Sequence, residues 1–325
     1  MPYTLADYAR LEKDPLRAGV IDVFRRESWI MEYLSFESID TLGITVLRTK
    51  SLPNVSFRKI NAGFAEGKGQ IEPMSERVYD AGAYIDVDKL LVKAKSLVDA
   101  RAMQADMIVT SLSYLFNDYF INGDPTIDED GLTGLWYRSL NTKFTVTGSH
   151  YNPEAGLDIS PDSGALSASE DKALDYIQGA MHRLDGHKAD IIGANDTFYL
   201  RLISAIRKKG LFATTEDSYG RQVSTYGPGG PKIIDLGTKA DQTSRIIGDV
   251  ENVNGLVLSG GTASSIYFFR LGEKYLRGIQ LYPVDVDDVG KLEDARTFRT
   301  AVDWPMGIAH PSPRAIVRLS GIVVA

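Results

Sequence analysis

The chain has 325 residues, of which 43% are hydrophobic and 24% charged, a composition typical of globular proteins and unlike that of disordered or membrane-spanning chains. Its formal charge of −7 argues against sequence-independent binding of nucleic acid, which needs a basic surface. The negative charge is still compatible with a protein that encloses nucleic acid within acidic walls. The absence of Cys excludes disulfides, thiolate nucleophiles and Cys-ligated zinc. The length predicts two subdomains.

The first residues, Met1-Pro-Tyr-Thr-Leu-Ala-Asp-Tyr, lack the basic and apolar regions of a signal peptide, so we expect synthesis in the cytoplasm. No run approaches the ~18 apolar residues of a membrane-spanning helix. Asp14 and Pro15 then form a typical helix start. The short amphipathic segment that follows is either a helix docked on its own domain or an arm that lies on a neighbouring subunit.

Residues 44–92 predict a long two-stranded hairpin, because β-favouring residues flank a Gly-rich turn at residues 61–69. The arms carry opposite charges. Basic residues on the first arm are Arg48, Lys50, Arg58 and Lys59; acidic residues on the second are Glu72, Glu76, Asp80, Asp86 and Asp88. An isolated two-stranded ribbon is at best marginally stable in water. The hairpin therefore packs on its own domain or against another chain, and its length and mixed charge favour another chain.

Residues 99–123 predict a long amphipathic helix with one apolar stripe. Asp99 is the expected N-cap, and Gly123 the expected left-handed C-terminal cap. About 22 residues at ~1.5 Å each give a rod of about 33 Å. The expected stripe consists of Met103, Met107, Ile108, Leu112, Leu115, Phe116 and Tyr119.

The following part of the chain predicts a compact α/β unit. Ser167 and Glu170 form a capping box that opens a helix with an apolar stripe ending near Gly186. A short buried strand is expected at residues 189–193, and Asn195 caps a third helix. Further strands are expected at residues 233–236, 264–271, 278–286, 296–304 and 314–322, with a proline-punctuated turn over residues 304–314.

Motifs for catalysis, metals or cofactors are incomplete. Residues 63–69 resemble a phosphate-binding loop, but the spacing is one residue short and Gly69 stands in place of Ser or Thr. The acidic segments 128–131 and 285–290 lack the ligand pattern of a calcium loop, although weak ion binding at a subunit contact stays open. No two of the four His residues have the i, i+4 spacing of a helical zinc site. We predict no catalytic residue, no metal site and no cofactor.

Several short segments stand in a characteristic order along the chain. They are Ala65-Glu-Gly, Ile71-Glu-Pro-Met-Ser, the strand at 84–91 before the long helix, Asn122-Gly-Asp, Gly131-Leu, Ile247-Gly-Asp, and Trp304-Pro-Met-Gly-Ile-Ala-His-Pro-Ser-Pro-Arg-Ala. Over nearly the whole chain this order resembles the major capsid protein of tailed bacteriophages (Caudoviricetes), with the Hong Kong 97-type capsid fold.

The resemblance implies an α+β fold with four parts. Residues 1–43 would be an N-arm and 44–92 an extended loop over an adjacent subunit. Residues 93–134 and 278–325 would form a peripheral domain around a long spine helix, and 135–277 an α/β axial domain. Hexamers and pentamers would build an icosahedral shell around packaged double-stranded DNA, without sequence-specific binding and without enzymatic activity. Expected subunit contacts are Arg58, Lys59, Glu66, Lys68, Glu72 and Arg77.

The expected location is the virion capsid, after synthesis in the host cytoplasm. The Met start close to the arm predicts a separate scaffolding protein or none; portal and decoration proteins are further expected partners, and no membrane is. Some relatives join Lys and Asn of neighbouring subunits in an isopeptide bond. Here the nearest Lys is Lys68 and residues 290–296 contain no Asn, so we predict no such cross-link. Two alternatives remain: an encapsulin-like compartment with the same fold, and a soluble α/β enzyme of unrecognised motif.

Overall fold

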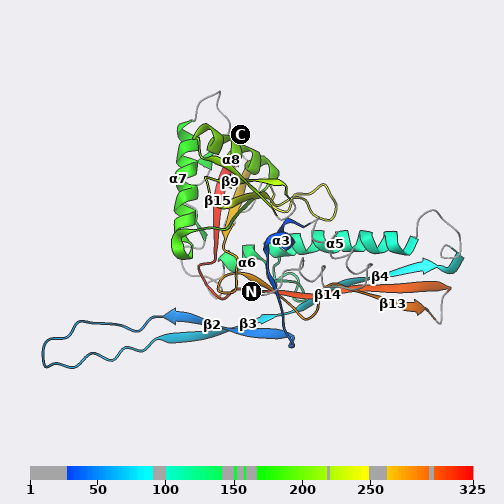
Figure 1. The fold of residues 1–325 in the computed structure, drawn as a ribbon, viewed down its shortest axis with the longest axis horizontal. Coiled ribbons are helices and arrows are strands. Elements are labelled where there is room, and N and C mark those ends of the chain that lie inside the picture. The colour runs from blue at the N-terminus through cyan, green and yellow to red at the C-terminus, as the bar shows by residue number, and fades with distance from the viewer. Residues whose placement is uncertain are drawn as a thin grey trace.

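The computed structural model describes residues 28–90, 100–140, 150–151, 157–158, 167–217, 220–248, 262–292 and 296–324. It consists of two sheets, a long helix that covers the smaller sheet, and a hairpin that projects from the body (Figure 1). The helix predicted after Asp14 and the predicted N-cap Asp99 lie outside the described residues.

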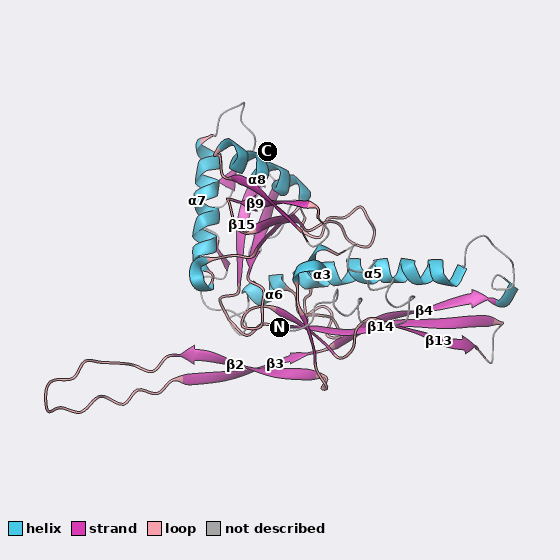
Figure 2. Ribbon diagram, viewed as in Figure 1, coloured by secondary structure: helices cyan, strands magenta, loops and turns pink. Residues whose placement is uncertain are grey.

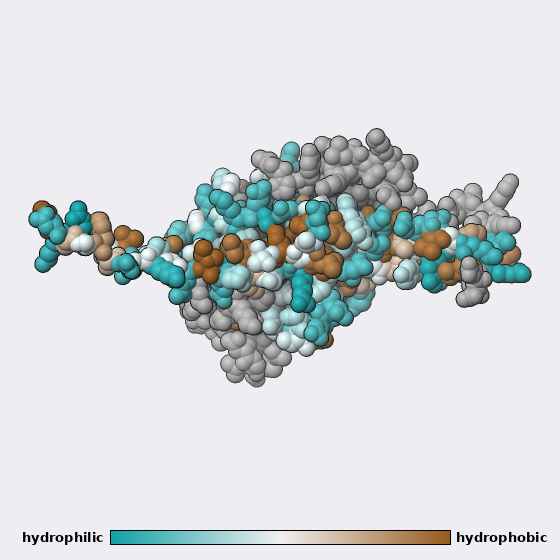
Figure 3. Space-filling model, turned by 90° about the horizontal axis from the view of Figure 1, so that it is seen from below, coloured by the Kyte–Doolittle hydropathy of each residue, from teal (hydrophilic) through white to brown (hydrophobic). Residues whose placement is uncertain are grey.

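The projecting hairpin is formed by β2 (Gly43–Ser51) and β3 (Gln70–Arg77). The two strands pair antiparallel with each other and with no other described strand. Figures 2 and 3 show that the loop between them reaches well beyond the body. The predicted hairpin is therefore present, but it ends at Arg77 and not near residue 92.

The residues after the hairpin belong to a five-stranded sheet, which we call the spine sheet. Strand β4 (Tyr79–Asp88) pairs antiparallel with β14 (Thr297–Ala309) from Asp88 opposite Thr297 to Tyr79 opposite Met306. The other members are β1 (Phe36–Ser38), β12 (Arg277–Gln280) and β13 (Asp285–Lys291). Placing Asp80, Asp86 and Asp88 on a hairpin arm was therefore wrong, because β4 finds its partner more than 200 residues away.

The long helix α5 (Ala100–Asn122) is confirmed and lies along the spine sheet (Figure 1). Its buried face differs from the predicted stripe: Met107 is 57% and Leu115 38% exposed. The buried apolar positions are Ala105, Val109, Leu112, Phe116, Phe120 and Ile121. Gly123 is not a left-handed cap. A Cβ there would lie 1.9 Å from the carbonyl oxygen of Leu132. Glycine is required because the backbone at Leu132 packs directly against the C-terminal end of the helix.

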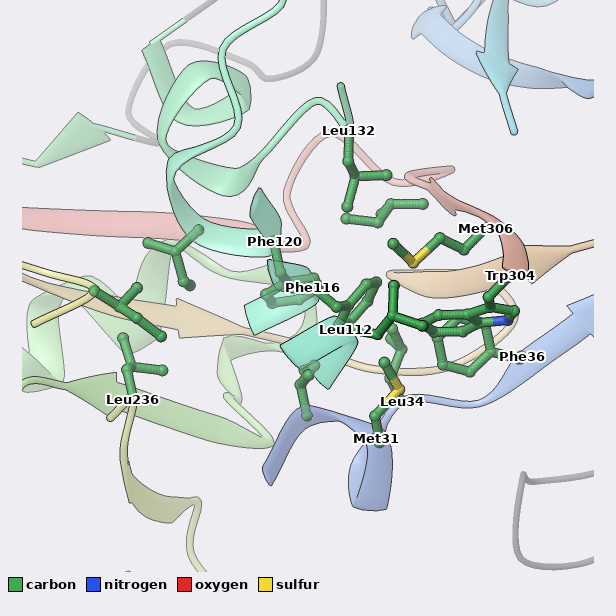
Figure 4. Close-up of a cluster of buried hydrophobic side chains, with 14 of the residues drawn as sticks. Met31, Leu34, Phe36, Leu112, Phe116, Phe120, Leu132, Leu236, Trp304 and Met306 are labelled. Carbon is green, nitrogen blue, oxygen red and sulfur yellow. The ribbon is translucent and has the colours of Figure 1, made fainter. Parts of the chain in front are cut away.

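An aromatic cluster joins the helix to the spine sheet (Figure 4). The Trp304 ring centroid lies 5.2 Å from that of Phe36 and 5.4 Å from that of Phe116. Phe116 continues the cluster to Phe120 at 5.8 Å. The Trp304 indole nitrogen donates to the side-chain oxygen of Gln280 at 3.1 Å, which satisfies the polar atom of this buried ring. The short helix α3 (Trp29–Tyr33) supplies Ile30 and Met31 to the same core.

The second sheet has eight strands. Its order is β5 (His150–Tyr151), β15 (Ile316–Val324), β11 (Thr262–Phe269), β7 (Ile191–Ala194), β10 (Lys232–Asp235), β9 (Gln222–Tyr226) and β8 (Phe212–Glu216), with β6 (Leu157–Asp158) also on β15. Helices α7 (Ala168–Arg183) and α8 (Asp196–Lys208) share a core with it. The predicted N-caps of α7 and α8 are confirmed: Ser167 forms a full capping box and Asn195 accepts from the Phe198 amide.

Two predictions for strand bounds in the C-terminal part were wrong, whereas the domain to which the last strand belongs stays a prediction. The last strand, β15, pairs with β11 in the eight-stranded sheet, and its Ile316 lies in the same core as Phe116 of the long helix. The single strand expected over residues 278–286 is divided between β12 and β13. Strand β14 continues through Pro305 to Ala309, so the turn begins later than predicted. The connecting elements are α6 (Leu135–Leu140) and the short 3-10 helix η1 (Asp185–His187).

Candidate subunit-interface site

The hairpin presents a long surface that its own chain does not cover. Residues 52–69 are all exposed, and both outer edges of the β2–β3 pair lack a partner among the described strands. The two legs of the loop run close together, since a Cβ on Gly67 would lie 2.3 Å from the Asn54 carbonyl oxygen. Unpaired edges expose backbone donors and acceptors that can pair with another strand.

One face of the hairpin root packs on the body. In the register Val46 is opposite Met74, and buried Val46 shares a small apolar cluster with Ile279 and Ala309. The Val78 amide donates to the Leu42 carbonyl at 3.0 Å, where the root joins the spine sheet. These contacts hold the base of the hairpin, whereas the loop beyond it extends into solvent (Figure 1).

A buried ion pair also holds this root. The Arg138 guanidinium on α6 donates to both carboxylate oxygens of Glu76, at 2.7 and 2.9 Å. Both side chains are buried, at 2% and 5% exposure. Arg138 also donates from Nε to the Thr133 carbonyl at 2.9 Å. Such bidentate, charge-assisted geometry fixes direction as well as distance, so it orients the hairpin relative to α6.

A second guanidinium lies at the same place. Arg48 on β2 is buried, and its Nη2 donates to the carbonyl oxygen of His310. Burial, opposed by the charge of Glu76 and reinforced by the charge of Arg138, lowers the pKa of Arg48 to about 10. Sequence analysis placed Arg48 and Glu76 on the hairpin without an anchoring role, and it did not single out Arg138. The alternation of β3, which puts Glu76 in phase with Met74, is the signal that could have indicated a buried carboxylate.

The six predicted contact residues lie on the exposed part of the hairpin. Four of them are in the loop: Arg58, Lys59, Glu66 and Lys68. Glu72 lies on β3 opposite Arg48, and Arg77 is the last residue of β3. Arg58 donates to the Ala62 carbonyl at 3.1 Å, and its guanidinium carbon lies 5.2 Å from the Phe64 ring centroid. Their role in subunit contacts stays a prediction.

Sequence analysis missed the apolar side chains of the hairpin. Leu47 on β2 is 68% and Ile71 on β3 67% exposed, on the face opposite to Val46. The loop adds further exposed apolar residues: Leu52, Val55, Phe57, Ile60 and Phe64. Brown hydrophobic residues are interspersed with hydrophilic ones along the projecting hairpin in Figure 3. Seven exposed large apolar side chains on one projecting hairpin indicate a surface that another molecule covers.

The acidic and Gly-rich segments have local roles. Asp124 accepts from the Thr126 amide at 2.8 Å, and Asp288 accepts from the Gly290 amide at 2.9 Å. Residues 63–69, which resemble a phosphate-binding loop, lie in the exposed hairpin loop. Within the described residues, no three His, Asp or Glu side chains gather to hold a metal ion. A search of the same residues finds no helix with the length and apolarity needed to cross a membrane.

Comparisons with known proteins agree with this geometry. Residues 13–152 match a family model described as major capsid protein GP7. The solved holo-SrpI encapsulin complex of Synechococcus elongatus PCC 7942 is 14% identical, with a TM-score of 0.61 over 91% of this chain and 87% of that one. The capsid of a native GTA particle is 15% identical, with a TM-score of 0.59 over 90% of each chain. The capsid of Myoviridae phage XM1 is 13% identical, with a TM-score of 0.54 over 90% and 91%. No curated protein sequence matches the chain significantly.

The chain therefore shares its fold with solved phage capsid and encapsulin chains, and the predicted α+β fold of the Hong Kong 97 type is confirmed. The predicted resemblance to a major capsid protein is confirmed as well, by the family match over residues 13–152 together with the phage capsid neighbours.

Proposed function

We propose that this chain is the major capsid protein of a tailed bacteriophage, that it assembles as hexamers and pentamers, and that the resulting icosahedral shell encloses packaged double-stranded DNA. The single observation that carries the proposal is the hairpin, whose apolar loop and unpaired edges are exposed on an isolated subunit. In this proposal the role of the chain is mechanical, that of a structural protein and not of an enzyme.

The energetics favour an apolar and main-chain contact over a purely ionic one. Burying a large apolar side chain contributes roughly 1.5–3 kcal/mol, and the hairpin exposes several of them, among them Phe57, Ile60 and Phe64. An exposed ion pair contributes only about 0–1 kcal/mol. Pairing of a strand with a free edge adds backbone hydrogen bonds. Arg58, Lys59, Glu66, Lys68, Glu72 and Arg77 then set partner choice and register at the rim of the contact.

The domain assignment is a proposal whose boundaries follow the strand pairing. Residues 43–77 form the extended loop, and β4, β12, β13 and β14 with α5 form the peripheral domain. The axial domain contains the eight-stranded sheet, including β15 at the C-terminal end. The N-arm is confined to residues before α3, because α3 and β1 pack in the main core.

Repetition supplies the strength of the shell. Each contact recurs in every subunit of a closed symmetric assembly, so modest energies for each contact add up. The formal charge of −7 suits a wall that encloses DNA without binding its sequence. Scaffolding, portal and decoration proteins are the further partners in this proposal, and the virion capsid is the proposed location.

The test is negative-stain electron microscopy of particles purified with the full chain, followed by nuclease treatment and analysis of what the particles contain. Closed particles from virions support the proposal if they contain nuclease-protected DNA. Closed particles that hold a copurified enzyme and no DNA would identify an encapsulin-like compartment instead. A small oligomer under all assembly conditions would contradict a shell function of either kind.

A further inference from the structure

The hairpin root contains a buried histidine that the shell function does not use. His310 follows directly after β14 and is completely buried. Its main-chain carbonyl accepts from Arg48, but neither ring nitrogen makes a hydrogen bond with any described residue. Buried polar atoms in native proteins nearly always have a partner, so an unpartnered imidazole calls for an explanation.

The elements that meet at His310 are those that hold the hairpin. Arg48 comes from β2, Glu76 from β3 and Arg138 from α6. Arg138 Nη2 also lies 3.3 Å from the Ile308 carbonyl oxygen, two residues before His310. We call Arg48, Glu76, Arg138 and His310 the hairpin clasp. It links both strands of the hairpin to the helix and to the end of the spine sheet.

The clasp already holds more buried positive than negative charge. Two guanidinium groups and one carboxylate are buried there, and Glu72, which is exposed on β3 opposite Arg48, is the other carboxylate that affects Arg48. On its own segment, a polar contact with the Ser312 backbone raises the pKa of His310 and so opposes the effect of the two guanidinium groups. An imidazolium added to this group would be buried beside two like charges.

We propose that His310 is a proton-operated release for the hairpin: the neutral imidazole permits the closed clasp, and its protonation frees β2 and β3 from α6. Release would let the hairpin change direction relative to the body. The clasp lies within one subunit, so its opening does not depend on assembly. Opening would also change the surface of a neighbouring copy that the hairpin contacts, and this consequence rests on the proposed shell function.

The direction of the pH effect follows from linkage. Burial, Arg138 and Arg48, in that order, hold the pKa of His310 well below its usual value in the closed clasp. In the open state the ring is hydrated, with an ordinary pKa of about 6.5. The closed clasp is therefore fully stable above that pH. Below it, the ratio of closed to open falls about tenfold for each pH unit until the lowered pKa is reached.

The chain offers a clean experiment because it contains no Cys. Spin labels on Val55→Cys in the loop and Leu200→Cys on α8, both exposed, report the distance between hairpin and body. Labelled full-length chain is diluted with excess unlabelled chain, so that distances within one subunit dominate. We expect one narrow distance distribution at pH 7.5 and a second, broad population at pH 5.0. His310→Gln should keep the narrow distribution at both pH values, whereas the matched variant His182→Gln, at an exposed histidine, should respond like the wild type.

Two results would overturn the proposal: an unchanged wild-type distribution at pH 5.0, or an equal response in wild type and His310→Gln. If His310→Gln does not fold, hydrogen exchange of the β2–β3 root amides decides the matter in the wild-type chain. Opening that rises about tenfold per pH unit below about 6.5, after correction for intrinsic exchange, supports the release. A flat profile contradicts it. Neither outcome depends on particle formation, so failure of the release and failure of the shell function are distinguishable.

Discussion

Replacing Arg138 by Met tests whether the buried ion pair anchors the hairpin root. The substitution keeps an unbranched apolar stem but removes the guanidinium, so the Glu76 carboxylate, which is 5% exposed, loses its partner. Breaking a buried pair from one side costs about 3–5 kcal/mol. The Thr133 carbonyl also loses a donor, which adds about 1 kcal/mol. We therefore expect Arg138→Met to lose about 4–6 kcal/mol of unfolding free energy.

Replacing the carboxylate partner should cost a similar amount. In Glu76→Gln the guanidinium of Arg138 keeps its hydrogen bonds to the Thr133 and Ile308 carbonyls, but Arg138 and Arg48 lose the buried carboxylate that compensates their charges. We expect a loss of about 3–5 kcal/mol. The double variant Arg138→Met with Glu76→Met should recover part of the loss of Arg138→Met, because the unpaired carboxylate is removed while Arg48 remains as a buried charge. The unfolding free energies are measured by urea denaturation of the unassembled full chain.

A matched control is available on the spine sheet. Arg299 makes the same bidentate contact to Asp86, with both distances at 2.7 Å, but the two side chains are 31% and 40% exposed. Arg299→Met should therefore cost far less than Arg138→Met, because solvent screens an exposed pair. Equal losses in Arg138→Met and Arg299→Met would refute the reasoning, because geometry alone and not burial would then decide the cost.

Three further predictions test the core, a helix cap and a titrating pair. Phe116→Ala removes a fully buried ring and should cost about 3–5 kcal/mol in urea unfolding; Leu115→Ala, at a partly exposed position, should cost far less, and equal losses would contradict the assignment of the buried face. Ser167→Ala should cost about 1 kcal/mol and speed amide exchange in the first turn of α7; unchanged exchange there would contradict the cap. The hydrogen bond from Arg299 lowers the pKa of Asp86, so the pair contributes fully above the ordinary Asp pKa of about 3.9 and is lost as pH falls through the lowered value. By NMR titration the Asp86 carboxyl should titrate at higher pH in Arg299→Met; an unchanged midpoint would disprove the coupling.

Local signals in the sequence were sufficient for elements whose residues contact their own neighbours. Ser167 and Glu170 bond each other across one helical turn, and Asn195 caps α8 in the same way. The position of α5 also followed from its apolar content. Its buried face was harder to predict, because Met107 and Leu115 are apolar residues on the exposed side.

Long-range pairing could not be derived from the sequence. The alternation of β4 shows a strand with one buried face, but it is equally compatible with pairing to β3 or to β14. The observed partner is β14, with Ile85 opposite Thr300. Likewise the last strand could join either sheet, and the pairing of β15 with β11 is decided by the packing of the whole chain.

The sequence predicted the exposed hairpin but not the buried ion pair at its root. The residue pattern located the exposed hairpin and its charges, including Arg58 and Lys68. It did not distinguish the solvated charges from Glu76, whose partner Arg138 lies 62 residues away in the sequence. Apolar residues such as Phe57 were assigned to strands, although the loop that holds them has no partner strand among the described residues.

The central claim is that the hairpin loop holds subunits together. Residues 53–68 can be replaced by an Asn-Gly turn, because the two legs are adjacent where they leave the strands: a Cβ on Gly69 would lie 3.4 Å from the Ser51 carbonyl oxygen. The decisive measurement is particle formation by this variant and by the wild-type chain, by electron microscopy of the purified proteins, alongside their unfolding midpoints. We predict an unchanged midpoint and no closed particles for the variant. Closed particles in wild-type yield would contradict the account.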